Sequence, residues 1–261
     1  MALAFGMIAL LYAAVGFGGG SSYAALLALA GTDYLLLPVI ALVCNILVVS
    51  GGTWRFAREG QIDWRRSWPL LAASVPCAWL GGRLPVSPLV FVSLLGGALL
   101  VAGLLMIVRP WLEARAIPMP AGGAAGASLC GTGEQRGVLL AAGGGIGLLS
   151  GMVGIGGGIF LAPLLHLARW APARAIAGTA ALFILVNSFA GLAGQVAKRG
   201  ALGAADLAPY VGLFVAVVVG GQIGSWLGAT RLRARQIEIA TAILVLFVAV
   251  RLLGQAAGMA A

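Results

Sequence analysis

Long apolar runs alternate along the sequence with short clusters of charged residues, prolines or glycines. A transmembrane α-helix needs about 20 consecutive, mostly apolar residues to cross the hydrocarbon layer of a bilayer. The pattern therefore predicts an all-α polytopic membrane protein. We place its full spans at residues 36–53, 67–84, 88–108, 175–197, 207–229 and 236–254.

Two further apolar runs, 2–30 and 137–168, are too long for one relaxed span, and glycines interrupt each of them near its middle. Glycine destabilises a helix interior by about 1 kcal/mol relative to alanine, so clustered glycines break a helix. We therefore expect each run to form two short helices joined by irregular backbone deep in the membrane. The interrupting segments are Gly18-Gly19-Gly20 followed by Ser21-Ser22, and Gly156-Gly157-Gly158 followed by Ile159.

The two glycine segments align with each other, and the match continues beyond them, which indicates a tandem duplication. The alignment pairs Asn45 with Asn187, Gly52-Thr53 with Gly194-Gln195, and Trp79-Leu80-Gly81 with Trp226-Leu227-Gly228. We assign the first repeat to residues 1–110 and the second to residues 137–261. Residues 111–136 are rich in Gly, Ala and Pro and are predicted to form a flexible linker.

The distribution of basic residues indicates how the two repeats cross the membrane. If each glycine-broken run passes straight through, the repeats are parallel. The loops then carry nine Lys/Arg on one side and six on the other, with Arg251 near the end of the last span left out of this count. If each run folds into a re-entrant hairpin, the repeats are inverted, and the division becomes twelve against four. The positive-inside rule favours the second division. We therefore expect two inverted repeats, each a re-entrant hairpin plus three transmembrane helices, with a cytoplasmic linker and both termini outside.

The composition agrees with a membrane location, since 61% of residues are hydrophobic and 9% are charged. Soluble domains carry about 25% charged residues. The net charge of +9 would raise the question of nucleic acid in a soluble domain. Here the basic residues lie at the ends of apolar runs, as juxtamembrane anchors do, so we expect lipid and no nucleic acid as a partner. The sequence leaves open whether the chain forms a homo-oligomer.

The short helices expected after the glycines, 21–30 and 159–168, suggest an anion-binding site. The N–H groups of a helix's first turn lack intrahelical partners and carry positive partial charge, so two such ends near mid-membrane can bind an anion without a buried Lys or Arg. Ser21 and Ser22 are expected as N-caps. The alternative is that the glycines only allow close helix packing.

Polar residues inside the spans add further candidates, because such residues are rare in membrane helices and often functional. An Asn amide can donate to an anion. The alternative for each Asn is an interhelical hydrogen bond. The complete set of predicted substrate-binding residues is Gly18, Gly19, Gly20, Ser21, Ser22, Asn45, Gly156, Gly157, Gly158, Ile159, Asn187 and Gln195.

No pattern indicates an enzyme. The single histidine, His166, has no carboxylate close to it in the sequence, and we expect a packing or pore-lining role. The sequence has no His/Cys/carboxylate set for a metal and no nucleotide-binding loop, so we expect no cofactor.

The twin glycine segments, the span with Asn45 and the loop Gly60-Gln61-Ile62-Asp63-Trp64-Arg65 resemble the TauE/SafE family of sulfite and organosulfonate exporters. The resemblance covers nearly the whole chain. It implies a transporter of the bacterial inner membrane that moves sulfite, sulfoacetate or similar small anions. The chain departs from the family at two points. Ser21-Ser22-Tyr23 stands where family members often have a proline, and loop 199–206 of the second half lacks the Asp-Trp-Arg motif.

Together these observations predict a secondary transporter that exports small sulfur-containing anions from a site between the repeats. An anion channel for the same solutes is one alternative, because sequence does not separate conduction from alternating access. A membrane scaffold or assembly protein without a solute is the other.

Overall fold

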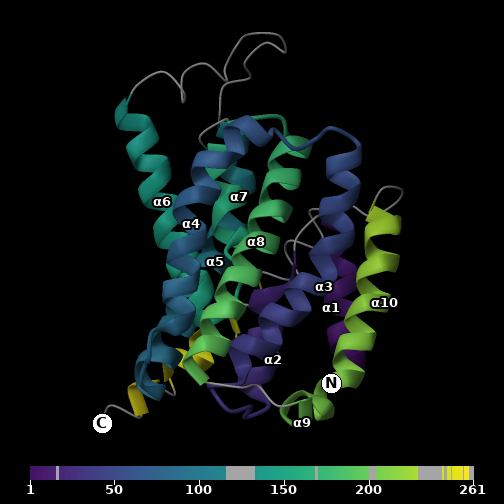
Figure 1. Ribbon diagram of the computed structural model, residues 1–261, viewed down its shortest axis with the longest axis vertical. Helices are drawn as coiled ribbons and strands as arrows, with labels where there is room; N and C mark the ends of the chain where they lie inside the picture. Colours follow the sequence, from purple (N-terminus) through teal and green to yellow (C-terminus); the bar gives the residue numbers. More distant parts are fainter. Residues whose placement is uncertain are drawn as a thin grey trace.

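The computed structural model describes residues 1–15, 18–115, 133–167, 170–199 and 204–228, with short helical stretches between 243 and 258. All regular secondary structure within these residues is helical (Figure 1). The elements are α1 (Ala2–Val15), α2 (Gly20–Leu29), α3 (Leu37–Arg58), α4 (Trp64–Arg83), α5 (Pro88–Arg115), α6 (Gly133–Val153), α7 (Gly158–Leu167), α8 (Ala173–Arg199), α9 (Ala204–Leu207), the 3₁₀ helix η1 (Ala208–Tyr210) and α10 (Val211–Gly228).

Four segments of the described chain are long and apolar enough to cross a membrane. They coincide with four of the six predicted spans and confirm a polytopic, all-helical membrane protein. They are Leu37–Arg58, Pro88–Leu105, Arg174–Lys198 and Ala208–Trp226.

The two remaining predicted spans have different outcomes. The span predicted at 67–84 coincides with α4, which is less apolar because it has arginines near both ends and two internal prolines. The span predicted at 236–254 lies mostly outside the described residues.

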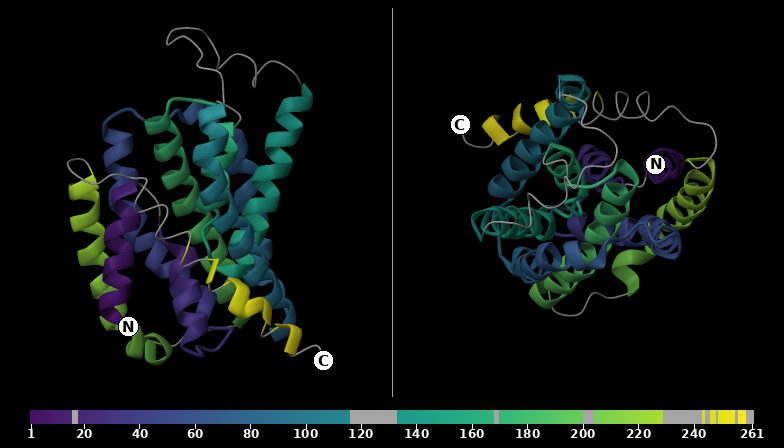
Figure 2. Two further views of the ribbon diagram at one scale, coloured as in Figure 1. Left: turned by 180° about the vertical axis from the view of Figure 1, so that it is seen from behind. Right: turned by 90° about the horizontal axis from the view of Figure 1, so that it is seen from above.

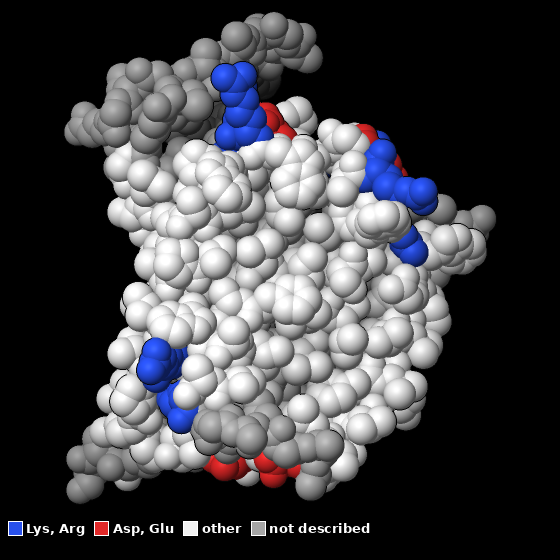
Figure 3. Space-filling model, viewed as in Figure 1, with Lys and Arg blue, Asp and Glu red and all other residues white. Residues whose placement is uncertain are grey.

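The charged side chains of the face in Figure 3 lie toward its two opposite ends, and the band between them carries none. A bilayer requires such a band, because a charged group facing hydrocarbon is costly. The expected lipid partner therefore agrees with the surface of the described chain.

The helices of the two halves are interleaved. α1 packs along α10, and α6 packs along α4, so the first helix of each half lies against a helix of the other half (Figure 2). α2 packs on α3, and α7 packs on α8, while α3 and α8 pack on each other at the centre. The same set of contacts therefore occurs twice, as a duplicated chain would produce.

Glycines allow the closest of these approaches. A Cβ atom on Gly224 would overlap the carbonyl oxygen of Leu10, and a Cβ atom on Gly81 would overlap that of Leu148. Leu10 and Leu148 are as far apart in the sequence as Gly18 and Gly156, so Gly81 and Gly224 occupy equivalent positions. The alignment of Gly81 with Gly228 is therefore wrong by four residues, about one helical turn, a shift that leaves the same helix face in contact.

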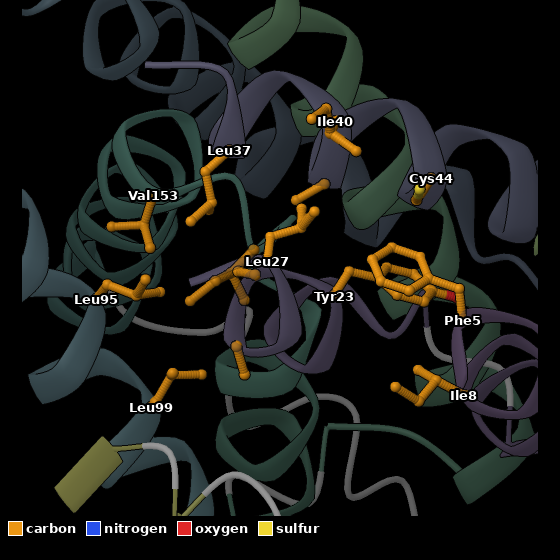
Figure 4. Close-up of a cluster of buried hydrophobic side chains, with 14 of the residues drawn as sticks. Phe5, Ile8, Tyr23, Leu27, Leu37, Ile40, Cys44, Leu95, Leu99 and Val153 are labelled. Carbon is orange, nitrogen blue, oxygen red and sulfur yellow. The ribbon is translucent and has the colours of Figure 1, made fainter. Parts of the chain in front are cut away.

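The core surrounds α2 and holds its first turn inside the protein (Figure 4). The ring of Phe5 stacks on Tyr23 of α2 with their centroids 5.0 Å apart. On the other side Leu27 belongs to the same buried cluster as Leu95 of α5 and Val153 of α6. The start of α2 is therefore shielded from lipid, which irregular backbone at this depth requires.

Candidate functional site

Two glycine turns interrupt the long apolar runs, as predicted. α1 ends at Val15 and α2 begins at Gly20, while α6 ends at Val153 and α7 begins at Gly158. The backbone has positive φ at Gly19 (77°) in the first turn. In the second turn φ is positive at Gly154 (81°), Gly156 (83°) and Gly157 (77°). Glycine adopts this conformation without the steric cost that other residues meet, so these positions need glycine.

The prediction that Ser21 and Ser22 cap α2 is wrong. The N-cap of α2 is Gly19, without a side-chain hydrogen bond, and both serines lie inside the first turn. The hydroxyl of Ser22 shares a hydrogen bond of 2.8 Å with the hydroxyl of Tyr12, and Ser21 lies 3.5 Å from the same oxygen. The reason is that Gly19, which has a left-handed conformation, ends the glycine turn. The helix therefore starts at Gly20, one residue earlier than expected and before both serines. Ile159 likewise lies in the first turn of α7, because that helix starts at Gly158.

Asn45 lies where the two glycine turns meet. Its Oδ1 is 2.6 Å from the place that a Cβ atom on Gly18 would occupy, and its Nδ2 is 2.8 Å from the corresponding place on Gly156. A Cβ atom on Gly20 would also overlap this amide. The Nδ2 donates a long hydrogen bond of 3.4 Å to the carbonyl oxygen of Gly154. One amide from α3 therefore contacts both turns, and only glycine leaves room for it.

The predicted equivalence of Asn45 and Asn187 is wrong. A Cβ atom on Gly158 would overlap the side chain of Ile184, as one on Gly20 would overlap Asn45. Ile184, three residues before Asn187, is therefore the counterpart of Asn45. The sequence alignment is shifted here by nearly one helical turn, so it matches residue types on similar faces and misses the true pair.

Asn187 is fully buried and lies one turn further along α8. The residue four before it, Phe183, lies against Gly157, and the residue four after it, Gly191, lies against Gly151. Residues four apart share a helix face, so Asn187 faces the end of α6. Neither side-chain polar atom of Asn187 has a hydrogen-bond partner among the described residues.

Gln195, predicted as a substrate-binding residue, contacts the end of α6. Its Nε2 donates a hydrogen bond of 3.0 Å to the carbonyl oxygen of Gly151, in the last turns of α6. This bond satisfies a carbonyl group near a helix end, where intrahelical partners run out. The geometry gives Gln195 a structural role beside α6, with its Oε1 left unpaired within the described chain.

Two serines near the turns were not predicted as site residues. The Oγ of Ser188 is 3.3 Å from the place of a Cβ atom on Gly156, and the Cβ of Ser150 is 3.4 Å from that on Gly157. Both hydroxyl groups are buried without a partner among the described residues. The available signal was weak, since each is a single serine inside an apolar run.

The buried polar side chains of the described chain are all neutral. A buried polar group without a hydrogen bond costs about 1–3 kcal/mol, so a group of them near one place suits a polar ligand. α2 and α7 both begin where the two glycine turns meet. The N–H groups of their first turns favour a negative charge there. The arrangement is therefore chemically suited to a small anion bound by neutral donors. The unpaired atoms within the described chain are Tyr23 Oη, Asn45 Oδ1, Thr53 Oγ1, Ser150 Oγ, Asn187 Nδ2 and Oδ1, Ser188 Oγ and Gln195 Oε1.

Comparison with known proteins identifies the chain's relatives. Residues 1–252 match the family described as sulfite exporter TauE/SafE. The chain belongs to the TauE/SafE family. A curated relative from Sinorhizobium fredii (strain NBRC 101917 / NGR234), called probable membrane transporter protein y4hK, is 34% identical over 253 residues, which cover 97% of each chain. No solved structure matches.

Membership in the TauE/SafE family makes this chain a transmembrane transporter and confirms the resemblance carried by its glycine segments and its Gly60–Arg65 loop. It also agrees with the interpretation that the chain is not an enzyme. In the described part, no three His, Cys, Asp or Glu residues come together as a metal site.

Proposed function

We propose that this TauE/SafE protein is a secondary transporter that exports sulfite, sulfoacetate or a related C2 organosulfonate across the bacterial inner membrane. The family description supports the substrate class. The observation that carries the binding site is the meeting of two positive-φ glycine turns around the buried amide of Asn45.

The anion binds at the first turns of α2 and α7, which begin at Gly20 and Gly158. Backbone N–H groups and the Asn45 amide supply the donors, so no arginine is needed at this depth. Hydrogen bonds to a charged group contribute about 1.5–3 kcal/mol each, and two or three of them give the affinity a transported anion needs. The glycines leave the backbone open to close approach by the ligand.

The two repeats, 1–110 and 137–261, are inverted in this proposal, and each begins with a re-entrant hairpin. Two observations support inversion. Phe56 lies against Gly178 and Leu42 against Gly191, so the equivalent helices α3 and α8 run antiparallel. In Figure 1, α1 begins at the lower end of the molecule, whereas α6 begins at the upper end. After the second glycine turn the chain runs back to the upper end as α7. Inverted repeats around one central site provide two equivalent exits on opposite sides of the membrane, which alternating access requires.

The orientation follows from the charge distribution. The side with most Lys and Arg faces the cytoplasm. It includes the loop between α3 and α4 and the predicted linker 111–136, whose first and last residues belong to α5 and α6.

Counterflow in proteoliposomes tests the proposed activity. Vesicles loaded with unlabelled sulfite or sulfoacetate and diluted into labelled substrate should transiently accumulate the label against its gradient. A channel would only dissipate the gradient, and a scaffold protein would move no label, so either result would contradict the proposal.

A further inference from the structure

The two helix N-termini at the glycine turns have different side chains beside them. Gly20, the first residue of α2, faces the amide of Asn45. Gly158, the first residue of α7, faces the aliphatic side chain of Ile184. Because these two positions are equivalent by their contacts, an amide faces the first residue of α2 where an aliphatic side chain faces the first residue of α7. The polar atoms near the second turn, Asn45 Nδ2 and Ser188 Oγ, lie at Gly156, two residues before that helix start.

Burial strengthens this difference. Asn45 is fully buried, and its Oδ1 has no partner among the described residues. Ile184 is 3% exposed, and Ile155 and Ile159, on either side of Gly156–Gly158 in the sequence, are 4% and 7% exposed. The corresponding residue to Ile159 in α2 is Ser21, so the first turns of the two helices differ in the same sense.

We infer that Ile184 determines specificity, and that the site takes a monoanionic sulfonate with a short alkyl chain. This inference rests on the proposed function. The sulfonate oxygens lie at Asn45 and the first turn of α2, and the alkyl chain lies against Ile184 and Ile159. An inorganic oxyanion would have to lose water against Ile184 without gaining a hydrogen bond there. Burying two carbons favours the alkylsulfonate over sulfite by roughly tenfold.

Competition binding to the purified full-length protein tests the inference, with ethanesulfonate and sulfite as the probes. Wild type should bind ethanesulfonate about tenfold more tightly than sulfite. Ile184→Asn, which places a second amide at the site, should reverse this preference. The matched control is Leu185→Asn, which adds an amide at the next, half-buried position of α8 and should leave the preference unchanged.

Two further variants keep the result interpretable. Ile184→Ala serves as a second variant in case Ile184→Asn does not fold. It should weaken ethanesulfonate binding and leave sulfite binding unchanged. Asn45→Ile should remove binding of both anions, because it removes the polar half of the site. Thermal unfolding and size-exclusion elution identify any variant whose loss of binding reflects misfolding.

The outcomes separate the inference from the proposed function. Equal binding of both anions by wild type, with no change of preference in either Ile184 variant, would overturn the role of Ile184 and leave the anion site standing. Wild-type protein that binds neither anion nor any other sulfonate would overturn both.

Discussion

Replacement of Asn45 by alanine separates a ligand-binding role from a packing role for this amide. In the folded protein the change removes one long hydrogen bond, from Nδ2 to the Gly154 carbonyl at 3.4 Å. Such a neutral bond contributes about 0.5–1.5 kcal/mol to stability. The same change removes the unpaired Oδ1, whose burial costs about 1–3 kcal/mol. These two effects oppose each other, so we expect the free energy of unfolding to change by about 1 kcal/mol or less.

The effect on binding should be larger. An amide that donates to an anion contributes about 1.5–3 kcal/mol, which corresponds to a tenfold to hundredfold loss of affinity in Asn45→Ala. Asn45→Asp should bind even more weakly, because a carboxylate repels the anion and offers no N–H donor. Asn187→Ala is the comparison variant, and it should lose less affinity because Asn187 is not among the nearest contacts of Gly18, Gly20 or Gly156.

Isothermal calorimetry with ethanesulfonate or sulfite measures affinity, and thermal unfolding in the same detergent measures stability. An Asn45→Asp protein that binds the anion as tightly as wild type would refute the assignment of Asn45 to the site. An Asn45→Ala protein that loses several kcal/mol of stability and no affinity would make the amide a packing element.

Three other predictions concern the glycines and the orientation. Gly19→Val should abolish anion binding while reducing the yield of folded protein much less, measured by binding and size-exclusion chromatography, because a β-branched residue resists the positive φ and its Cβ would press on Ile8 and Tyr23, which displaces the first turn of α2. Normal binding would make the glycine a packing device. Gly81→Ala and Gly224→Ala should each lower the unfolding temperature, because the added Cβ atom overlaps a carbonyl oxygen of the neighbouring helix. Gly97→Ala should not, because its Cβ atom meets nothing within 4 Å. Equal effects at all three positions would contradict the assigned close contacts. An impermeant maleimide should label Cys130 only after cells are permeabilised, with Cys130→Ser as the control, and labelling of intact cells would reverse the orientation.

The sequence predicted the elements of this fold well wherever the deciding physics is local. Clustered glycines destabilise a helix whatever surrounds them, and the breaks before Gly20 and Gly158 fall within one residue of the expected helix starts. The four confirmed spans follow from hydropathy in the same way, because lipid leaves a backbone few choices.

The pairing of residues between the halves was predicted less well. Aligning identical letters matched Asn45 with Asn187, whereas the contacts match Asn45 with Ile184. Asn187 and Ile184 are about one helical turn apart on α8, so they lie on nearly the same helix face. An alignment of residue types therefore cannot tell which of the two is the structural counterpart of Asn45. Ser150 and Ser188 escaped prediction because they reach the turns from different helices, and that proximity arises only on folding.

The interleaving of the halves has a consequence for biosynthesis. α1 leaves the ribosome first, yet α10, against which its glycine-lined face packs, lies near the other end of the described chain. Contacts between segments so distant in sequence form late. While the intervening helices are being made, the backbone of Gly6 and Leu10 faces lipid or an insertion factor, with its close partners Gly220 and Gly224 still untranslated. The first half therefore reaches its mature packing only after the second half has been inserted.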